Sequence, residues 1–212
     1  MNEEIIFFMN ACIGLFVIVD PFAVIPIYLM LTDRFDAKAK KATRRKASLI
    51  AFCILVVFAI SGLSLFKLFG ITLPAFQIAG GILLLLLGLA QLNASDKKMK
   101  NEETAEGLER EDISIFPLAM PLIAGPGSIS TVVLYASEAH DWMRKLNILL
   151  VIAVVMLLSD ATLKSAPLLF RFLGRTGLNI LTRIMGIILT AIAIQFIING
   201  THGAYKHILT GS

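Results

Sequence analysis

Apolar residues follow one another along this chain in runs of helix length, and the polar residues are gathered between the runs. Each run reaches the roughly 20 residues that a helix needs to cross a hydrocarbon core. The six runs cover residues 5–32, 47–69, 71–92, 113–137, 146–170 and 178–200. Because a chain inside lipid must satisfy its own backbone hydrogen bonds, the pattern predicts six transmembrane helices and an all-α membrane protein.

Composition and charge agree with a membrane protein. The 212 residues are 57% hydrophobic and 16% charged, and the mean hydropathy is +0.83. The formal charge of +4 does not indicate a nucleic-acid partner, because the cations are distributed by side. Thirteen Lys and Arg follow the first, third and fifth runs, and four lie at the opposite ends. The positive-inside rule then predicts a multi-pass protein of the plasma or inner membrane with both termini outside.

Two proline-containing stretches interrupt the first and fourth apolar runs. Pro21 and Pro26 lie in DPFAVIP, and Pro121 and Pro126 lie 100 residues later in PLIAGPG. Each proline lacks a backbone N–H and frees the carbonyl four residues earlier. Since an unpaired backbone group is costly in a bilayer, we expect the broken backbone to be buried in protein or to line a wet cavity.

Further matches relate the two halves of the chain. LFKLFGIT at 65–72 is similar to LFRFLGRT at 169–176, and IAGGIL at 78–83 is similar to IMGIIL at 184–189. The chain is therefore divided into a first three-helix repeat (1–93), a cytoplasmic linker (94–112) and a second three-helix repeat (113–212), all in one membrane domain. Because three is odd, the repeats have inverted topology, which is typical of secondary transporters.

The two breaks predict a binding site with opposite charge at its two ends. The helix that restarts after Pro126 offers N–H groups at its positive end to a carboxylate. Asp20 suits an ammonium group or a cation, and it also fits a helix N-cap before Pro21. Small residues leave space for a small side chain. The predicted substrate-binding residues are Asp20, Pro21, Phe22, Ala23, Pro26, Pro121, Ala124, Gly125, Pro126, Gly127 and Ser128.

Asp160 is an acidic residue within the fifth run. Lys164 follows it at i+4, the favourable order for an ion pair on one helix face, so a structural pair is favoured over an ion carrier. If the protein is an ion-coupled transporter, Asp20 and Asp160 are the two candidates for carrying the coupling ion, H⁺ or Na⁺. No other cofactor and no metal site is expected. Enzymatic activity is not expected either, because no histidine lies within a run where it could activate Ser128.

These motifs resemble the MarC family of membrane proteins, which includes SnatA-like neutral amino acid transporters. The resemblance covers essentially the whole chain and rests on DPFAVIPIYLMLT at 20–32 and FPLAMPLIAGPGSIST at 116–131. Ala23 departs from the glycine that is common in the family at this point. The resemblance implies symport of small neutral amino acids such as glycine and alanine by alternating access, coupled to a proton or sodium gradient, with the site at the two broken helices.

Other functions stay open at this point. The same scaffold would suit export of another small metabolite or of a drug, and a non-transporting membrane assembly protein is the remaining alternative. A passive pore requires polar residues along several helices. It is disfavoured because the apolar runs show no such polar stripe. The expected partners are the lipid bilayer, a small neutral amino acid and a second copy of the chain, and nucleic acid is not among them.

Overall fold

The computed structural model describes residues 2–92, 112–139 and 141–210, and within them it contains helices and no strand. Of the predicted linker at 94–112, only Asp112 lies within the described residues. The helices are α1 (Asn2–Val19), α2 (Pro21–Leu31), α3 (Ala37–Phe69), α4 (Leu73–Leu92), η1 (Ser114–Ile123), α6 (Pro126–Glu138), α7 (Trp142–Lys164) and α8 (Ala166–Thr210).

The described helices confirm a multi-pass membrane protein. Five segments are long and apolar enough to cross a bilayer: Glu4–Leu31, Ala37–Gly62, Leu73–Leu92, Trp142–Lys164 and Thr176–Lys206. The pair formed by η1 and α6 makes a sixth if the two helices, which are bent by 58°, count as one span. The second helix begins ten residues before the predicted run, since the basic stretch ahead of residue 47 is helical as well.

Large apolar side chains cover the outer surface of this bundle. Ile60 is 71% exposed and Phe172 is 80% exposed, on two different helices. Exposed apolar area costs about 25 cal/mol per Å² in water, a penalty that lipid removes. The outer surface is therefore suited to hydrocarbon, while the buried cluster between the helices holds the bundle together.

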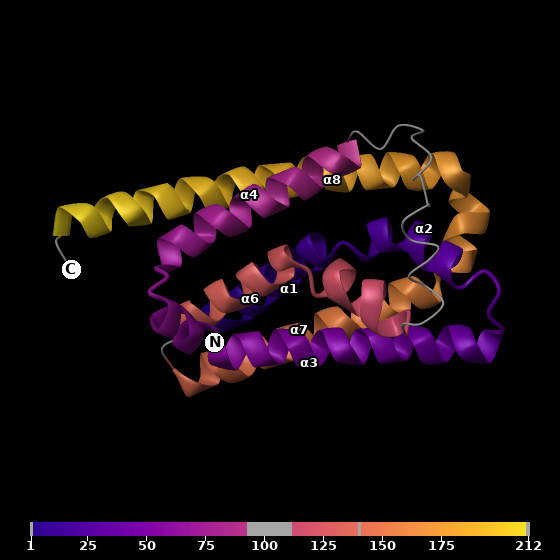
Figure 1. The fold of residues 1–212 in the computed structure, drawn as a ribbon, viewed down its shortest axis with the longest axis horizontal. Coiled ribbons are helices and arrows are strands. Elements are labelled where there is room, and N and C mark those ends of the chain that lie inside the picture. Colours follow the sequence, from indigo (N-terminus) through magenta and orange to yellow (C-terminus); the bar gives the residue numbers. More distant parts are fainter. Residues whose placement is uncertain (1, 93–111, 140, 211–212) are drawn as a thin grey trace.

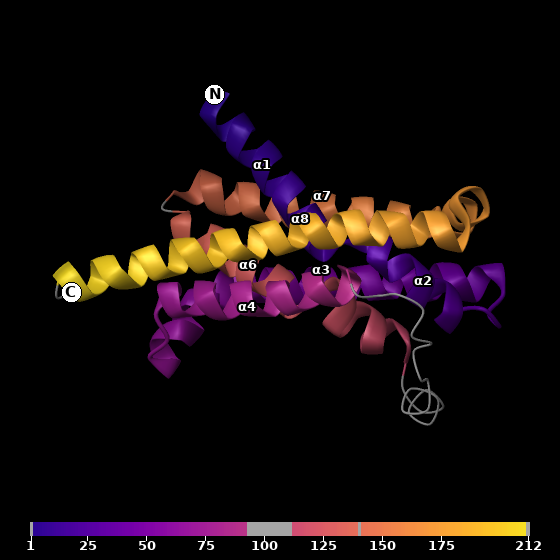
Figure 2. The ribbon, with the colours of Figure 1, turned by 90° about the horizontal axis from the view of Figure 1, so that it is seen from above.

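Helices α4 and α8 lie side by side along one side of the molecule (Figures 1 and 2). A Cβ atom on Gly88 would lie 2.4 Å from Thr190 Oγ1, and one on Gly200 would lie 2.9 Å from the Pro74 carbonyl oxygen. Residue numbers rise on one helix as they fall on the other, so the pair is antiparallel. Small residues permit this close approach of two membrane helices.

Helices α1 and α6 form a second antiparallel pair. A Cβ atom on Gly14 would lie 2.7 Å from Tyr135 Oη, and one on Gly127 would lie 3.3 Å from Ile18 Cγ2. Figure 1 shows the broken spans, α1 with α2 and η1 with α6, between the α4–α8 pair and helices α3 and α7. The interrupted segments thus lie in the middle of the bundle.

Helices α3 and α7 form the third pair, on the side away from α4 and α8 (Figure 1). Arg44 of α3 forms an ion pair with Asp160 of α7, and further along the two helices Phe52 and Ala153 line a common groove. The first apolar run therefore contacts the fourth, the second the fifth and the third the sixth. The first run packs on the fifth as well, and the fourth packs on the second.

Two glycines matched between the halves of the sequence share a positive φ. Gly70 has φ +65° between α3 and α4, and Gly174 has φ +62° at a kink within α8. Positive φ is favourable for glycine and strained for most other residues. The sequence match therefore coincides with a shared interruption of the helix ahead of the third and the sixth run.

Candidate functional site

Asp20 alone separates α1 from α2. It has φ 45° and ψ 62°, a left-handed conformation that Asp and Asn tolerate better than most residues. The Ala23 N–H donates to Asp20 Oδ1 at 3.3 Å, so the carboxylate caps α2, and Pro21 follows at a position that needs no N–H. The predicted N-cap is confirmed. Helix α2 continues through Pro26, so this second proline does not interrupt the span.

Gln91 links α4 to this first break. Asp20 is only 3% exposed, and Gln91 Nε2 donates to Asp20 Oδ2 at 2.8 Å. Within the described part of the chain, Asp20 forms no ion pair, and its side chain is held by neutral donors. Gln91 Oε1 is buried without a hydrogen-bond partner there. The site therefore holds a buried carboxyl group and an unused amide oxygen.

The second break begins within η1, where Phe116 and Met120 have non-helical conformations, and it ends at Pro126, where α6 begins. Ala124 and Gly125 connect the two helices in non-helical conformations. The Ser128 hydroxyl donates to the Ile123 carbonyl at 3.0 Å and so pairs a group that the break would otherwise leave free.

The start of α6 carries the N–H groups expected at this break. The Ile129 N–H is engaged, because it donates to the Gly125 carbonyl at 3.0 Å. The N–H groups of Gly127 and Ser128 belong to the first helical turn, where the helix itself supplies no acceptor. The N–H groups of Gly127 and Ser128 are therefore at a helix N-terminus with no intrahelical acceptor.

The two breaks meet at Gly127. A Cβ atom on Gly127 would lie 2.2 Å from Leu84 Cδ2 of α4 and 3.3 Å from Ile18 Cγ2, and Ile18 is two residues before Asp20. The space expected for a substrate side chain next to Gly127 is thus filled here by Leu84 and Ile18. At Gly125, the Pro121 carbonyl oxygen occupies the corresponding position, 2.5 Å from an added Cβ.

The predicted substrate-binding residues differ in burial. Three prolines are exposed, so they shape the helices without facing the interior: Pro26, Pro121 and Pro126. Phe22 and Ala23 are half-buried. The buried members are Asp20, Pro21, Ala124, Gly125, Gly127 and Ser128. Leu84 and Gln91 join the site from α4. Gln91 could have been found from the sequence, because it is a polar residue at the end of an apolar run. Leu84 could not, because it stands in a row of five leucines.

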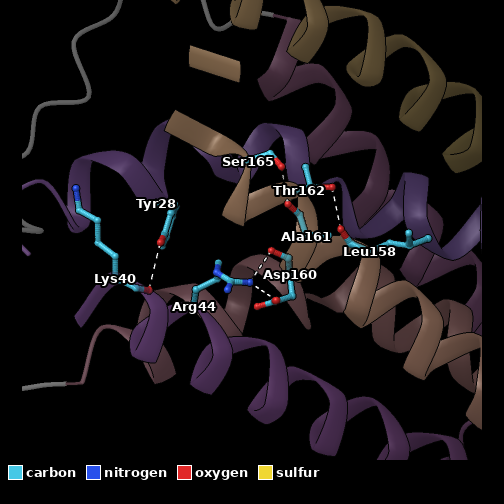
Figure 3. Close-up of polar contacts among 8 residues, drawn as sticks. All are labelled: Tyr28, Lys40, Arg44, Leu158, Asp160, Ala161, Thr162 and Ser165. Carbon is cyan, nitrogen blue, oxygen red and sulfur yellow. Dashed lines mark hydrogen bonds and ion pairs between the residues drawn. The ribbon is translucent and has the colours of Figure 1, made fainter. Parts of the chain in front are cut away.

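Asp160 pairs with Arg44 and not with Lys164 (Figure 3). The Arg44 guanidinium reaches from α3 to the Asp160 carboxylate, and its Nη1 also donates to the Asp160 carbonyl at 2.8 Å. Arg44 is 4% exposed, while Lys164 is exposed. The predicted Lys164 pair is wrong because α3 begins at Ala37 and carries the basic stretch alongside α7.

Fold and site together define a helical multi-pass membrane protein with two broken spans that converge in its interior. Residues 5–205 match the model of the MarC family integral membrane protein, and the chain belongs to that family.

Relatives from distant organisms match nearly the whole chain. It is 39% identical over 209 residues to a UPF0056 membrane protein of Aquifex aeolicus, covering 98% of each chain. It is 40% identical over 199 residues to MJ1677 of Methanocaldococcus jannaschii, covering 93% of this chain and 97% of the other. It is 35% identical over 199 residues to YhcE of Escherichia coli, covering 93% of each. Their names describe membrane proteins and state no transported molecule. No solved structure matches the chain.

Proposed function

We propose that this protein is a secondary active transporter of small neutral amino acids. The proposal rests on the convergence of the two broken spans. Gly127 of the second span packs against Ile18 of the first, two residues before Asp20. One break contributes a buried carboxyl group, and the other contributes the N-terminus of α6. An amino acid carries an ammonium and a carboxylate group, and these two ends complement the two breaks.

The close packing around the breaks favours a substrate with a small side chain. Asp20, Gly127 and Ser128 are buried, and Leu84 fills the space beside Gly127, so the site is closed in this conformation. Substrate would enter when Leu84 moves away from Gly127. The space released by one leucine side chain accommodates glycine or alanine more readily than a bulky amino acid.

Alternating access follows from two inverted three-helix repeats. Antiparallel contacts between matching apolar runs are compatible with a pseudo-two-fold axis in the membrane plane, and the positive φ that Gly70 and Gly174 share supports this proposal. Two similar halves that pack in two alternative ways have states of similar energy, one open to each side. Both termini would then lie on the outer side of the plasma or inner membrane, as the distribution of Lys and Arg predicts.

Asp20 is the better of the two candidates for ion coupling. The Asp160 charge is balanced by Arg44, whereas the described contacts of Asp20 are a backbone N–H and the Gln91 amide. A carboxylate held only by neutral donors in a membrane interior is stabilised by a bound proton or Na⁺. We infer that the coupling ion binds at Asp20, next to the substrate.

Transport into liposomes tests this function. Purified full-length protein would be reconstituted, and uptake of radiolabelled glycine and alanine measured under a proton gradient, a sodium gradient and no gradient. Accumulation under one of the two gradients supports the proposal. Absence of accumulation under both, from protein that is inserted and monodisperse, contradicts it.

A further inference from the structure

A basic pocket lies where α3 begins and α7 ends, away from the two breaks. Its volume is about 540 Å³, and it is lined by five cationic side chains: Lys40, Lys41, Arg44, Arg45 and Lys164. The acidic residue that lines it is Asp160, and the ion pair with Arg44 neutralises this carboxylate. The remaining four cations give the pocket a strongly positive potential.

These four cations lack acidic partners in the described part of the chain. None of the ion pairs there involves Lys40, Lys41, Arg45 or Lys164. The wall of the pocket is fixed, because Tyr28 Oη donates to the Lys40 carbonyl at 3.2 Å (Figure 3). Cations gathered around one pocket attract an anion, and a bound anion relieves the repulsion among them. The pocket is therefore built for an anion.

An apolar groove continues from this pocket between the same two helices. It measures about 450 Å³ and shares Arg45 and Asp160 with the pocket. Its apolar walls are formed by side chains of α3 and α7: Leu49, Phe52, Ala153, Met156 and Leu157. Leu49 and Leu157 are exposed on the outer surface, which is the surface suited to hydrocarbon. An anionic group in the pocket would thus have an apolar channel directly beside it.

We propose that the pocket binds the phosphate group of an anionic phospholipid, and that an acyl chain of the same lipid lies in the groove. Basic pockets between membrane helices bind lipid headgroups, and the positive-inside rule places these cations at the inner surface. Free phosphate shares the headgroup chemistry and leaves the groove empty, so the groove favours a lipid. The proposal does not depend on transport activity.

Native mass spectrometry of the full-length protein in a neutral detergent tests the site. The probes are phosphatidylglycerol, phosphatidylcholine and inorganic phosphate. Wild type should bind phosphatidylglycerol in preference to both others. The variant K41Q/R45Q removes two pocket cations and should weaken phosphatidylglycerol binding by about thirtyfold, since each surface cation contributes about 1 kcal/mol.

The matched control is R34Q/K38Q, which removes the same charge from exposed positions that do not line the pocket. It should change binding by about threefold or less, because charges outside the pocket are screened. Equal weakening by both variants, equal binding of phosphatidylcholine and phosphatidylglycerol, or inorganic phosphate binding as tightly as the lipid would each overturn the proposal.

Discussion

Leu84 of α4 lies so close to Gly127 of α6 that even one added methyl group on Gly127 would collide with it, at 2.2 Å from Leu84 Cδ2. This contact joins the second broken span to the helix that also carries Gln91, the hydrogen-bond partner of Asp20. Both breaks are therefore held closed by the same helix. In the proposed mechanism, movement of α4 away from the breaks would open the substrate site, and alternating access requires that it open to one side of the membrane at a time.

The Gly127 contact predicts a loss of transport that a second substitution reverses. Gly127→Ala should reduce glycine uptake strongly, because the added methyl group takes the space that the substrate needs beside Gly127 and no longer lets Leu84 pack there, an overpacking that costs about 1–3 kcal/mol. Leu84→Ala in the same chain should restore uptake, since it removes the atoms that collide. Uptake by each variant in liposomes measures this, and the amount of inserted protein corrects for expression.

Gly203→Ala is the matched control for Gly127→Ala. A Cβ on Gly203 would lie 3.2 Å from Pro74 Cγ, so a small shift accommodates it and transport should stay near the wild-type rate. If Gly127→Ala transports as well as Gly203→Ala, closure at Leu84 is not part of the mechanism.

Asp20→Asn separates the capping role of Asp20 from its charge. Asn tolerates the left-handed conformation and its side-chain oxygen can still accept from the Ala23 N–H, so the fold should persist. The charge that would bind a proton or Na⁺ is lost, so uptake should no longer depend on the ion gradient.

Asp20→Ala, which also removes the cap, should lower the free energy of unfolding by about 1 kcal/mol relative to Asp20→Asn. Gradient-driven uptake by Asp20→Asn equal to wild type would exclude Asp20 as the ion carrier.

Local sequence chemistry explains why the first break could be predicted at Asp20. An aspartate followed by proline at the first helical position is a local signal, and it needs no knowledge of the rest of the fold. The position of Pro26 was harder to judge, because α2 absorbs the missing hydrogen bond without ending. Whether a proline breaks a helix depends on the packing around it, which the local sequence does not contain.

Contacts between residues far apart in the sequence could not be predicted from the sequence alone. Asp160 had a plausible partner four residues away in Lys164, but its real partner Arg44 is 116 residues earlier in the chain. Leu84 likewise meets Gly127 through tertiary packing, and one leucine in a row of leucines gives no sequence signal of that contact.

The Arg44–Asp160 ion pair should stabilise the folded protein. Replacing either residue alone should lower the stability. Arg44→Met or Asp160→Asn would each leave a largely buried charge without its partner, a loss of about 3 kcal/mol. The double variant should be more stable than the sum of the two single changes predicts. Thermal unfolding of the four proteins in detergent forms the complete double-mutant cycle.

Lys164→Met is the control for this cycle, because Lys164 lies four residues from Asp160 and is not its ion-pair partner. It should leave the unfolding midpoint nearly unchanged. A midpoint that falls as far in Lys164→Met as in Arg44→Met would show that the helical neighbour, and not Arg44, balances Asp160.

Acid should weaken one contact at the start of η1. Hydrogen bonds from Lys46 and then from Ser114 lower the pKa of Asp112 from its ordinary 3.8 to about 2. Because the folded-state pKa is the lower one, the stabilisation is fully present above pH 3.8 and is lost as the pH falls toward 2. The difference in unfolding midpoint between wild type and Asp112→Asn should therefore be present at about pH 5 and fade toward about pH 2. A difference that grows on acidification would contradict this assignment.

Counterflow exchange tests most directly whether the two broken spans enclose one small guest. Liposomes loaded with unlabelled glycine, alanine, valine or leucine would receive a trace of labelled glycine outside, and entry would be compared for wild type and Leu84→Ala. We expect wild type to exchange glycine with glycine and alanine only, and Leu84→Ala to accept the larger residues as well. Exchange with none of the four, or a size preference that Leu84→Ala leaves unchanged, would contradict a substrate site at Gly127.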